Sequence, residues 1–140
     1  MKIYLSTIAT TLVLFFAPIK GIILMVALAT ILDTCFGLWK AKKLGEEITS
    51  KIFRNGLIPK LVSYVAAVML IYASDVFIIN ALTLSVISVE FISTKIIALV
   101  LLSIEVKSMD ESFVKVNGYS FIEKIKNVIN RIKDIKKDLK

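Results

Sequence analysis

Apolar residues run through this chain in long blocks, without the period of 2 or 3.6 that a water-soluble strand or helix shows. Four blocks predict membrane-spanning helices, at residues 3–17, 21–39, 57–79 and 81–104. The first is shorter than the roughly 20 residues a crossing needs. It spans if Lys2 and Lys20 extend their amines to the interface. The pattern predicts an all-α integral membrane protein with about four transmembrane helices and a C-terminal amphipathic helix.

The fourth block is interrupted by Glu90 and Lys95. A charge at mid-depth costs about 2 to 3 kcal/mol on insertion scales. These two residues are five apart, which is not an ideal spacing for a helical pair. A second interpretation therefore makes residues 80–90 an external turn, followed by a shorter helix from Phe91 to Ile104.

Residues 105–140 are predicted to form a basic cytoplasmic tail, separate from the transmembrane domain of residues 1–104. Asn117-Gly118 is a turn signal, and Ser120 and Glu123 have the spacing of a capping box, so a helix should begin near Phe121. Its apolar residues then follow spacings of 4, 3, 4, 3 and 4: Phe121, Ile125, Val128, Ile132, Ile135 and Leu139. This seam fits either a helix lying on the inner leaflet or self-association between copies.

Basic residues give the predicted orientation. The loop between the second and third spans contains Lys40, Lys42, Lys43, Lys51, Arg54 and Lys60 against two acidic residues, and the tail has nine basic against six acidic residues. By the positive-inside rule, both segments and both termini are cytoplasmic. A signal peptide is the alternative for the first block, but Pro18 disfavours cleavage, and removal would place a basic segment outside.

Two acidic residues lie inside the apolar blocks, and charge at membrane depth is usually functional. Asp33 either faces a pore or pairs with Lys40 or Lys60 near the inner interface. Asp75 lies fifteen residues after Lys60, about 22 Å along a helix, so it could be a hydrated end near the outer surface. Small residues such as Gly37 would permit close helix approach.

Composition agrees with a membrane protein and excludes several kinds of chemistry. The 140 residues are 57% hydrophobic, and the mean hydropathy is +0.83. Cys35 is the sole cysteine and there is no histidine, which argues against a disulfide, a zinc site and nucleophilic triads. The scattered glycines form no phosphate-binding loop. We expect no enzymatic activity, cofactor, metal or small-molecule substrate. The net charge of +7 follows from the positive-inside rule, so nucleic acid is not expected either.

One stretch resembles a known family. Asp33, Gly37, the basic run 40–43, Thr49-Ser50-Lys51, Gly56-Leu57 and Lys60 follow one another in the order seen in the phage holin family linked to toxin secretion and lysis. Asp75 closes the third span as an acidic residue does in that family. The residues Glu105, Lys107, Ser108, Met109 and Glu111 resemble its E-x-K-S-[IM]-x-E stretch, while its next residue, Asn, is Ser112 here. The resemblance covers roughly residues 30–112.

The resemblance implies a protein that accumulates in the bacterial inner membrane and assembles into homo-oligomeric lesions at a timed moment. An endolysin would then reach the cell wall without necessarily touching this chain, and membrane lipid would be its other partner. The alternatives left open are a small transporter or channel subunit and a membrane-anchored oligomeric scaffold.

Overall fold

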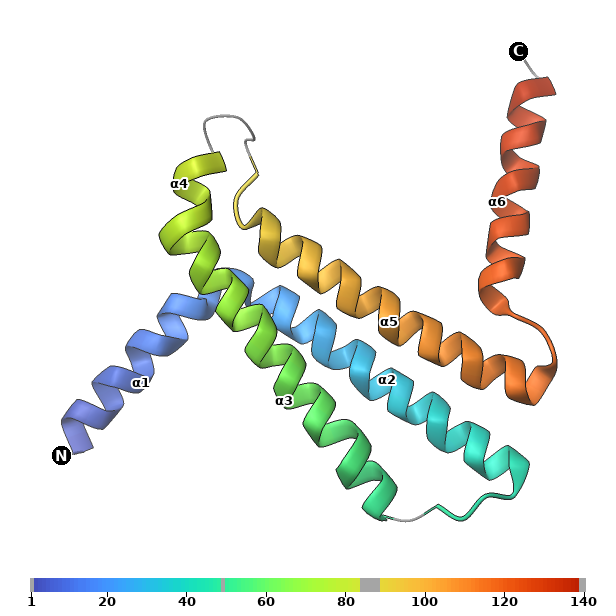
Figure 1. Ribbon diagram of the computed structural model, residues 1–140, viewed down its shortest axis with the longest axis horizontal. Helices are drawn as coiled ribbons and strands as arrows, with labels where there is room; N and C mark the ends of the chain where they lie inside the picture. The colour runs from blue at the N-terminus through green and yellow to red at the C-terminus, as the bar shows by residue number, and fades with distance from the viewer. Residues whose placement is uncertain (1, 49, 84–88, 139–140) are drawn as a thin grey trace.

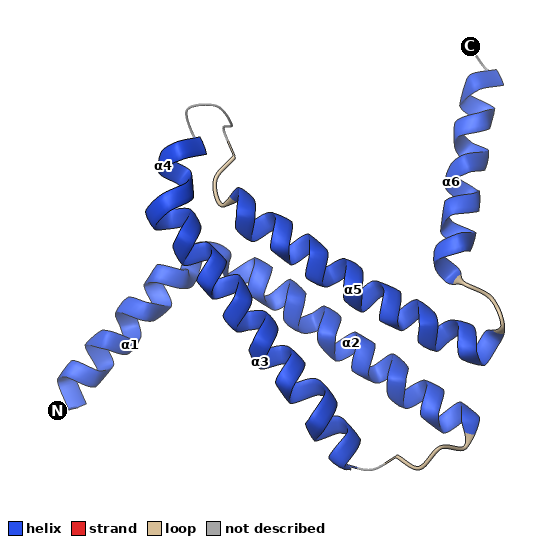
Figure 2. Cartoon of the chain, in the orientation of Figure 1, coloured by secondary structure: helices blue, strands red, loops and turns tan. Residues whose placement is uncertain are grey.

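Every regular element in the computed structural model is a helix, within the residues it describes: 2–48, 50–83 and 89–138 (Figure 2). The α-helices are α1 (Lys2–Phe16), α2 (Lys20–Leu44), α3 (Ser50–Ser74), α4 (Asn80–Thr83), α5 (Ile92–Asn117) and α6 (Phe121–Asp138). A 3-10 turn, η1 (Ala17–Ile19), joins α1 to α2, and a π-helical turn, η2 (Asp75–Ile79), joins α3 to α4. The predicted all-α class is confirmed.

Helices α2, α3 and α5 form the body of the molecule and lie side by side (Figure 1). The chain runs out along α2, returns along α3 and runs out again along α5, so α3 is antiparallel to its two neighbours. Buried apolar residues from η1 and all three helices meet in one cluster: Ile19, Val26, Val68, Tyr72, Ala98 and Leu101. This cluster sets the helix register that brings the polar residues below together.

The body shows an apolar exterior with polar residues inside. Leu24, Leu70 and Leu99 are each more than 60% exposed, whereas Asp75 and Glu105 are fully buried. Water-soluble proteins fully bury a charged residue almost only where it is paired, and they rarely expose large contiguous apolar patches. Two helical runs, Ser6–Leu44 and Arg54–Leu82, are long and apolar enough to cross a membrane.

Helix α1 leaves the body at η1, where Pro18 stands, and diverges from α2 (Figure 1). The end of α1 is anchored to α3: the Tyr72 hydroxyl donates to the Phe15 carbonyl at 2.9 Å, and Phe16 lies beside the same ring. The predicted end of the first block at Ala17 agrees with this break. The break bends the chain without folding α1 back along α2, so the count of four spans stays a prediction.

The fourth predicted span, 81–104, needs correction at both ends. Glu90 is exposed in the turn before α5, and the helix starts at Ile92 after Phe91, whose φ is +53°. The alternative, in which a helix begins near Phe91 after a turn, is therefore correct about where the helix begins. It is wrong about residues 80–83, which form α4, and residues 84–88 lie outside the described residues. Helix α5 also continues past Ile104 to Asn117, across the predicted domain boundary.

Helix α6 begins at Phe121, as its sequence predicts. Gly118 ends α5 with a φ of +75°, a conformation that glycine adopts without strain. The Ser120 hydroxyl accepts the backbone N–H of Glu123 at 3.0 Å, which confirms this half of the predicted capping box. Leu139, the last residue of the predicted seam, lies outside the described residues.

Candidate functional site

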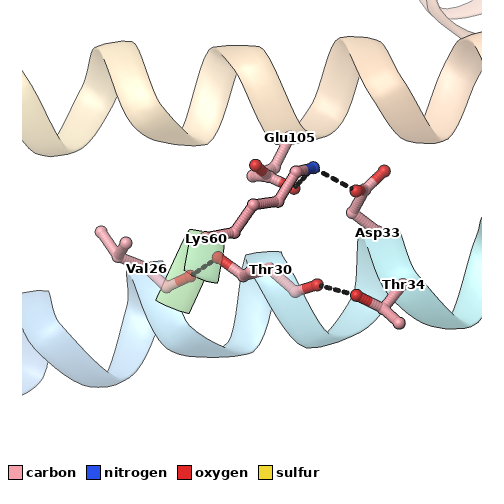
Figure 3. Close-up of polar contacts among 6 residues, drawn as sticks. All are labelled: Val26, Thr30, Asp33, Thr34, Lys60 and Glu105. Carbon is pink, nitrogen blue, oxygen red and sulfur yellow. Dashed lines mark hydrogen bonds and ion pairs between the residues drawn. The ribbon is translucent and has the colours of Figure 1, made fainter. Parts of the chain in front are cut away.

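A charged cluster joins the three body helices (Figure 3). The Lys60 Nζ on α3 donates to Asp33 Oδ2 on α2 at 2.8 Å and to Glu105 Oε2 on α5 at 3.3 Å. The Glu105 side chain is completely buried, that of Asp33 is 10% exposed, and that of Lys60 is 37% exposed. One ammonium group thus bridges two carboxylates, and if all three are ionised the cluster has a net charge of −1.

The inward faces of α2 and α5 place the two carboxylates. On α2 the buried positions include Val26, Thr30 and Asp33, at helical spacing. On α5 they follow spacings of 4, 3, 4, 4 and 3: Thr94, Ala98, Leu101, Glu105, Met109 and Ser112. Asp33 and Glu105 therefore lie on the buried faces of their helices, in line with the core residues. Because these two faces pack against each other, both carboxylates point toward Lys60.

The hydroxyl groups of two threonines on α2 form hydrogen bonds within their own helix. The Thr30 hydroxyl donates to the Val26 carbonyl, and the Thr34 hydroxyl to the Thr30 carbonyl, each at 2.9 Å (Figure 3). These bonds within one helix let hydroxyl groups sit inside an apolar environment without unpaired donors. The ion pairs of Lys60 are different because they link separate helices.

A polar hollow of about 280 Å³ lies beside the cluster and opens toward the end of α2. Asp33 and Lys60 border it, together with Thr34, Gly37, Leu38, Lys40, Ala41, Glu46, Ile48, Gly56, Ser108 and Ser112. A Cβ atom on Gly37 would meet nothing within 4 Å. Gly37 therefore borders open space within this chain and makes no close helix contact there, and its role in approach by another copy remains a prediction.

Asp75 forms a second buried polar site at the opposite end of α3. Its Oδ2 accepts the backbone N–H of Thr94 at 2.7 Å and the Thr94 hydroxyl at 2.6 Å. Nearby, the Asn80 Oδ1 accepts the backbone N–H of Phe91 at 3.3 Å. Asp75 thus caps the first turn of α5. The idea that Asp75 is a hydrated helix end is wrong, because it is fully buried.

The other predicted residues are mostly at the surface. Lys95, Lys107 and Glu111 are exposed on α5, and within the described residues Glu90 and Lys95 form no ion pair. At the end of α2, Lys40 is half-buried beside the hollow, while Lys42 and Lys43 are exposed, as is Arg54 on α3. Lys51 lies in α3. The tail seam from Ile125 to Ile135 is exposed.

Sequence reasoning missed the role of Glu105, which it treated only as part of a stretch following the last span. Its spacing of four from both Leu101 and Met109 would have placed it on the apolar stripe of a continuing helix. It named Ser108 in the same stretch but missed its position beside Asp33, and it missed Tyr64, which lies beside Glu105. Thr94 had no signal in the sequence, because its partner Asp75 lies nineteen residues away.

Comparison of the chain with protein-family models, characterised proteins and solved structures found no match. The function is therefore argued from the site and from the arrangement of the helices.

Proposed function

We propose that this chain is a holin-like pore former, which assembles from copies of itself in a bacterial inner membrane and allows an endolysin to reach the cell wall. The carrying observation is the charged cluster of Asp33, Lys60 and Glu105 buried inside a helix bundle with an apolar exterior. The sequence resemblance around Asp33 and Glu105 supports the same proposal.

The packing of the helices supports the proposed membrane location. Helices α2 and α3 supply the apolar runs, and α5 lies against both of them. A membrane that holds α2 and α3 therefore also holds the apolar part of α5. The end of α2, the start of α3 and the end of α5 share one end of the body with the basic loop. The positive-inside rule supports a cytoplasmic position for this end.

The charged cluster gives the proposal a physical mechanism. With its ion pairs formed, a single chain hides its charges from lipid and presents leucine, isoleucine and valine to the acyl chains. If α3 moves away from α2, the charges need new partners or water, because unpaired charges in lipid are costly. In an assembly, the polar surfaces of neighbouring copies face one another, so they provide new partners for these charges and enclose water between them. We propose that the closed bundle is the accumulating state and that separated helices line the lesion.

Inducible expression in a bacterium, with and without a cytoplasmic endolysin, tests this function. We expect normal growth during accumulation, then an abrupt stop, with lysis only when the endolysin is present. Continued growth at full membrane accumulation would contradict the proposal. Abrupt loss of membrane potential without endolysin release would instead favour a channel subunit, for which the polar hollow beside Lys60 is the supporting feature.

A further inference from the structure

Helix α6 runs at a large angle to α5 and does not lie alongside the body helices (Figure 1). Its start is tied to α5 by Asp110, whose Oδ1 accepts the backbone N–H groups of Phe121 and Ile122 at 2.8 and 3.3 Å. The Asp110 Oδ2 accepts the Ser120 hydroxyl at 2.7 Å. Beyond this joint, the apolar face of α6 is open: Ile125, Val128, Ile132 and Ile135 are each 55–59% exposed.

An aromatic cluster surrounds the joint. Phe113 on α5 stacks on Trp39 of α2 with ring centroids 6.0 Å apart, and the rings of Tyr119 and Phe121 lie edge-on to it at 5.4 and 5.6 Å. Tryptophan and tyrosine collect where the hydrocarbon layer meets water. The cluster therefore marks the membrane border, and α6 starts at that depth.

From Phe121 to Lys133, the charged residues of α6 lie around its apolar face, whereas Lys136, further along, falls at a position within that face. At about 100° per residue, Lys124 and Arg131 fall along one edge of that face, and Lys126 and Lys133 along the other. Glu123, Asn127 and Asn130 occupy the opposite side. An apolar face edged by basic residues is the pattern of a helix lying in the interface of an anionic membrane.

The same positions disfavour a coiled coil. Beside the seam, the flanking positions hold Lys124, Arg131 and Asp138 on one side and Ile122, Ile129 and Lys136 on the other. In a parallel pair of copies, Lys124 would face Ile129 and Arg131 would face Lys136, so the pair would form no salt bridge at these positions. The two isoleucines also make the apolar face broader than a two-helix seam covers.

We propose that α6 is an anionic-lipid-binding helix, lying on the cytoplasmic surface of the membrane that holds α2, α3 and α5. Its apolar face enters the headgroup region, and Lys126, Arg131 and Lys133 contact lipid phosphates, while the Lys124 Nζ lies over the Tyr119 ring, 3.6 Å from its centroid. The inference rests on the membrane location in the proposed function, but it does not require that the protein lyses cells.

The test uses the full chain with Cys35→Ser, reconstituted in vesicles of phosphatidylcholine with or without phosphatidylglycerol. A fluorophore on Ile129→Cys reports the apolar face, and one on Asn130→Cys reports the opposite face. With phosphatidylglycerol, we expect quenching from within the lipid at position 129 and from water at position 130. Quenching from water at both positions in both lipids would overturn the proposal.

Charge variants separate lipid binding from self-association. Lys126→Gln with Lys133→Gln should lower the ratio of bound to free α6 about 30-fold. The control, Lys42→Gln with Lys43→Gln, removes the same charge from the end of α2 and should leave the ratio unchanged. Protection of position 129 that is independent of phosphatidylglycerol and disappears when the protein is diluted in lipid would show pairing between copies. The delayed-lysis assay in cells is scored separately, and its outcome does not depend on whether α6 binds lipid or pairs with another copy.

Discussion

At the residue scale, Lys60 is the member of the charged cluster on which the other two depend. Glu105 is fully buried and Asp33 nearly so, and both carboxylates contact the same Nζ. Burying a charge is costly unless it is paired. Removing one partner of a buried pair therefore destabilises the fold, because the remaining charge stays buried without compensation. Lys60 itself is partly exposed at the hollow, which Asp33 also borders, so Lys60 is the most accessible of the three side chains.

Replacing Lys60 by Met keeps the length of the side chain but leaves two facing carboxylates. We expect Lys60→Met to lower the free energy of unfolding in detergent by about 2 to 3 kcal/mol. This is less than the 3 to 5 kcal/mol for a fully buried pair, because Lys60 is partly exposed. Lys95→Met, an exposed lysine without an ion pair in the described structure, is the control and should change it by less than about 0.5 kcal/mol. Adding Asp33→Asn and Glu105→Gln to Lys60→Met should restore most of the loss.

The sequence predicted one part of this cluster and missed another. Pairing of Asp33 with Lys60 was one of two alternatives, because both residues lie near the basic loop. Glu105 was assigned to a segment after the membrane, since an acidic residue followed by Lys107 normally marks the end of a span. Only tertiary packing of α5 against α2 and α3 shows that this carboxylate turns inward.

At the element scale, the turn between α3 and α5 is held by side chains of η2 and α4. The first N–H groups of a helix have no partner within it, and an acidic side chain there satisfies them and complements the helix dipole. Asp75 does both for the N–H of Thr94, while the neutral amide of Asn80 only accepts the N–H of Phe91. These two residues therefore fix where α5 begins, although they belong to the preceding helical segment.

Loss of the Asp75 cap should loosen the first turn of α5. We expect Asp75→Ala to lower stability by about 1 to 2 kcal/mol and to speed hydrogen exchange at the Thr94 amide. Thr94→Val removes only the hydroxyl bond, so that amide should stay protected by Asp75. Unchanged exchange at residue 94 in Asp75→Ala would show that the cap contributes nothing.

Helix boundaries were predictable where local chemistry sets them. Ser120 and the Asn117-Gly118 turn mark the gap between α5 and α6, and Pro18 marks the break at η1. The end predicted at Ile104 was not a boundary, because leaving the hydrocarbon layer does not end a helix. From Glu105 to Asn117 the polar residues either turn inward or face solvent, and the backbone continues in one helix.

At the scale of the whole molecule, the two ends of the body differ in charge. The start of α2, the end of α3 and the start of α5 meet at one end, and the basic loop lies at the other. The run Ser6–Leu44 is 39 residues, about 58 Å as straight helix, against a hydrocarbon layer of about 30 Å. One straight helix of this length is too long for a single crossing. Whether α1 crosses the membrane as a span distinct from α2 therefore depends on the bend at η1.

Labelling from one side of the membrane tests this topology. In a Cys35→Ser background, Glu47→Cys should react with a membrane-impermeant maleimide only after the cells are opened. Lys20→Cys and Glu90→Cys should react in intact spheroplasts, because the proposed topology brings the chain to the outer face at both places. All three native residues are exposed, so burial does not limit the reaction. Labelling of Glu47→Cys in intact spheroplasts would reverse the orientation. Labelling of Lys20→Cys only after opening would exclude a first crossing that ends at η1.

The timing of lysis links the charged cluster to the state of the whole molecule. Asp33→Asn leaves the pair of Lys60 and Glu105 in place, so the chain should still insert, but α2 loses its ion pair to α3. If separation of these helices limits assembly, the delay before lysis should shorten.

Asp75→Asn weakens the contact between η2 and α5 and should also shift the delay, whereas Glu47→Gln, which changes an exposed residue of the basic loop, should not. Turbidity of cultures that co-express an endolysin measures the delay, and immunoblots of membranes match the protein levels. Equal delays for the native chain, Asp33→Asn and Asp75→Asn would remove both acids from the mechanism, even if lysis itself occurs.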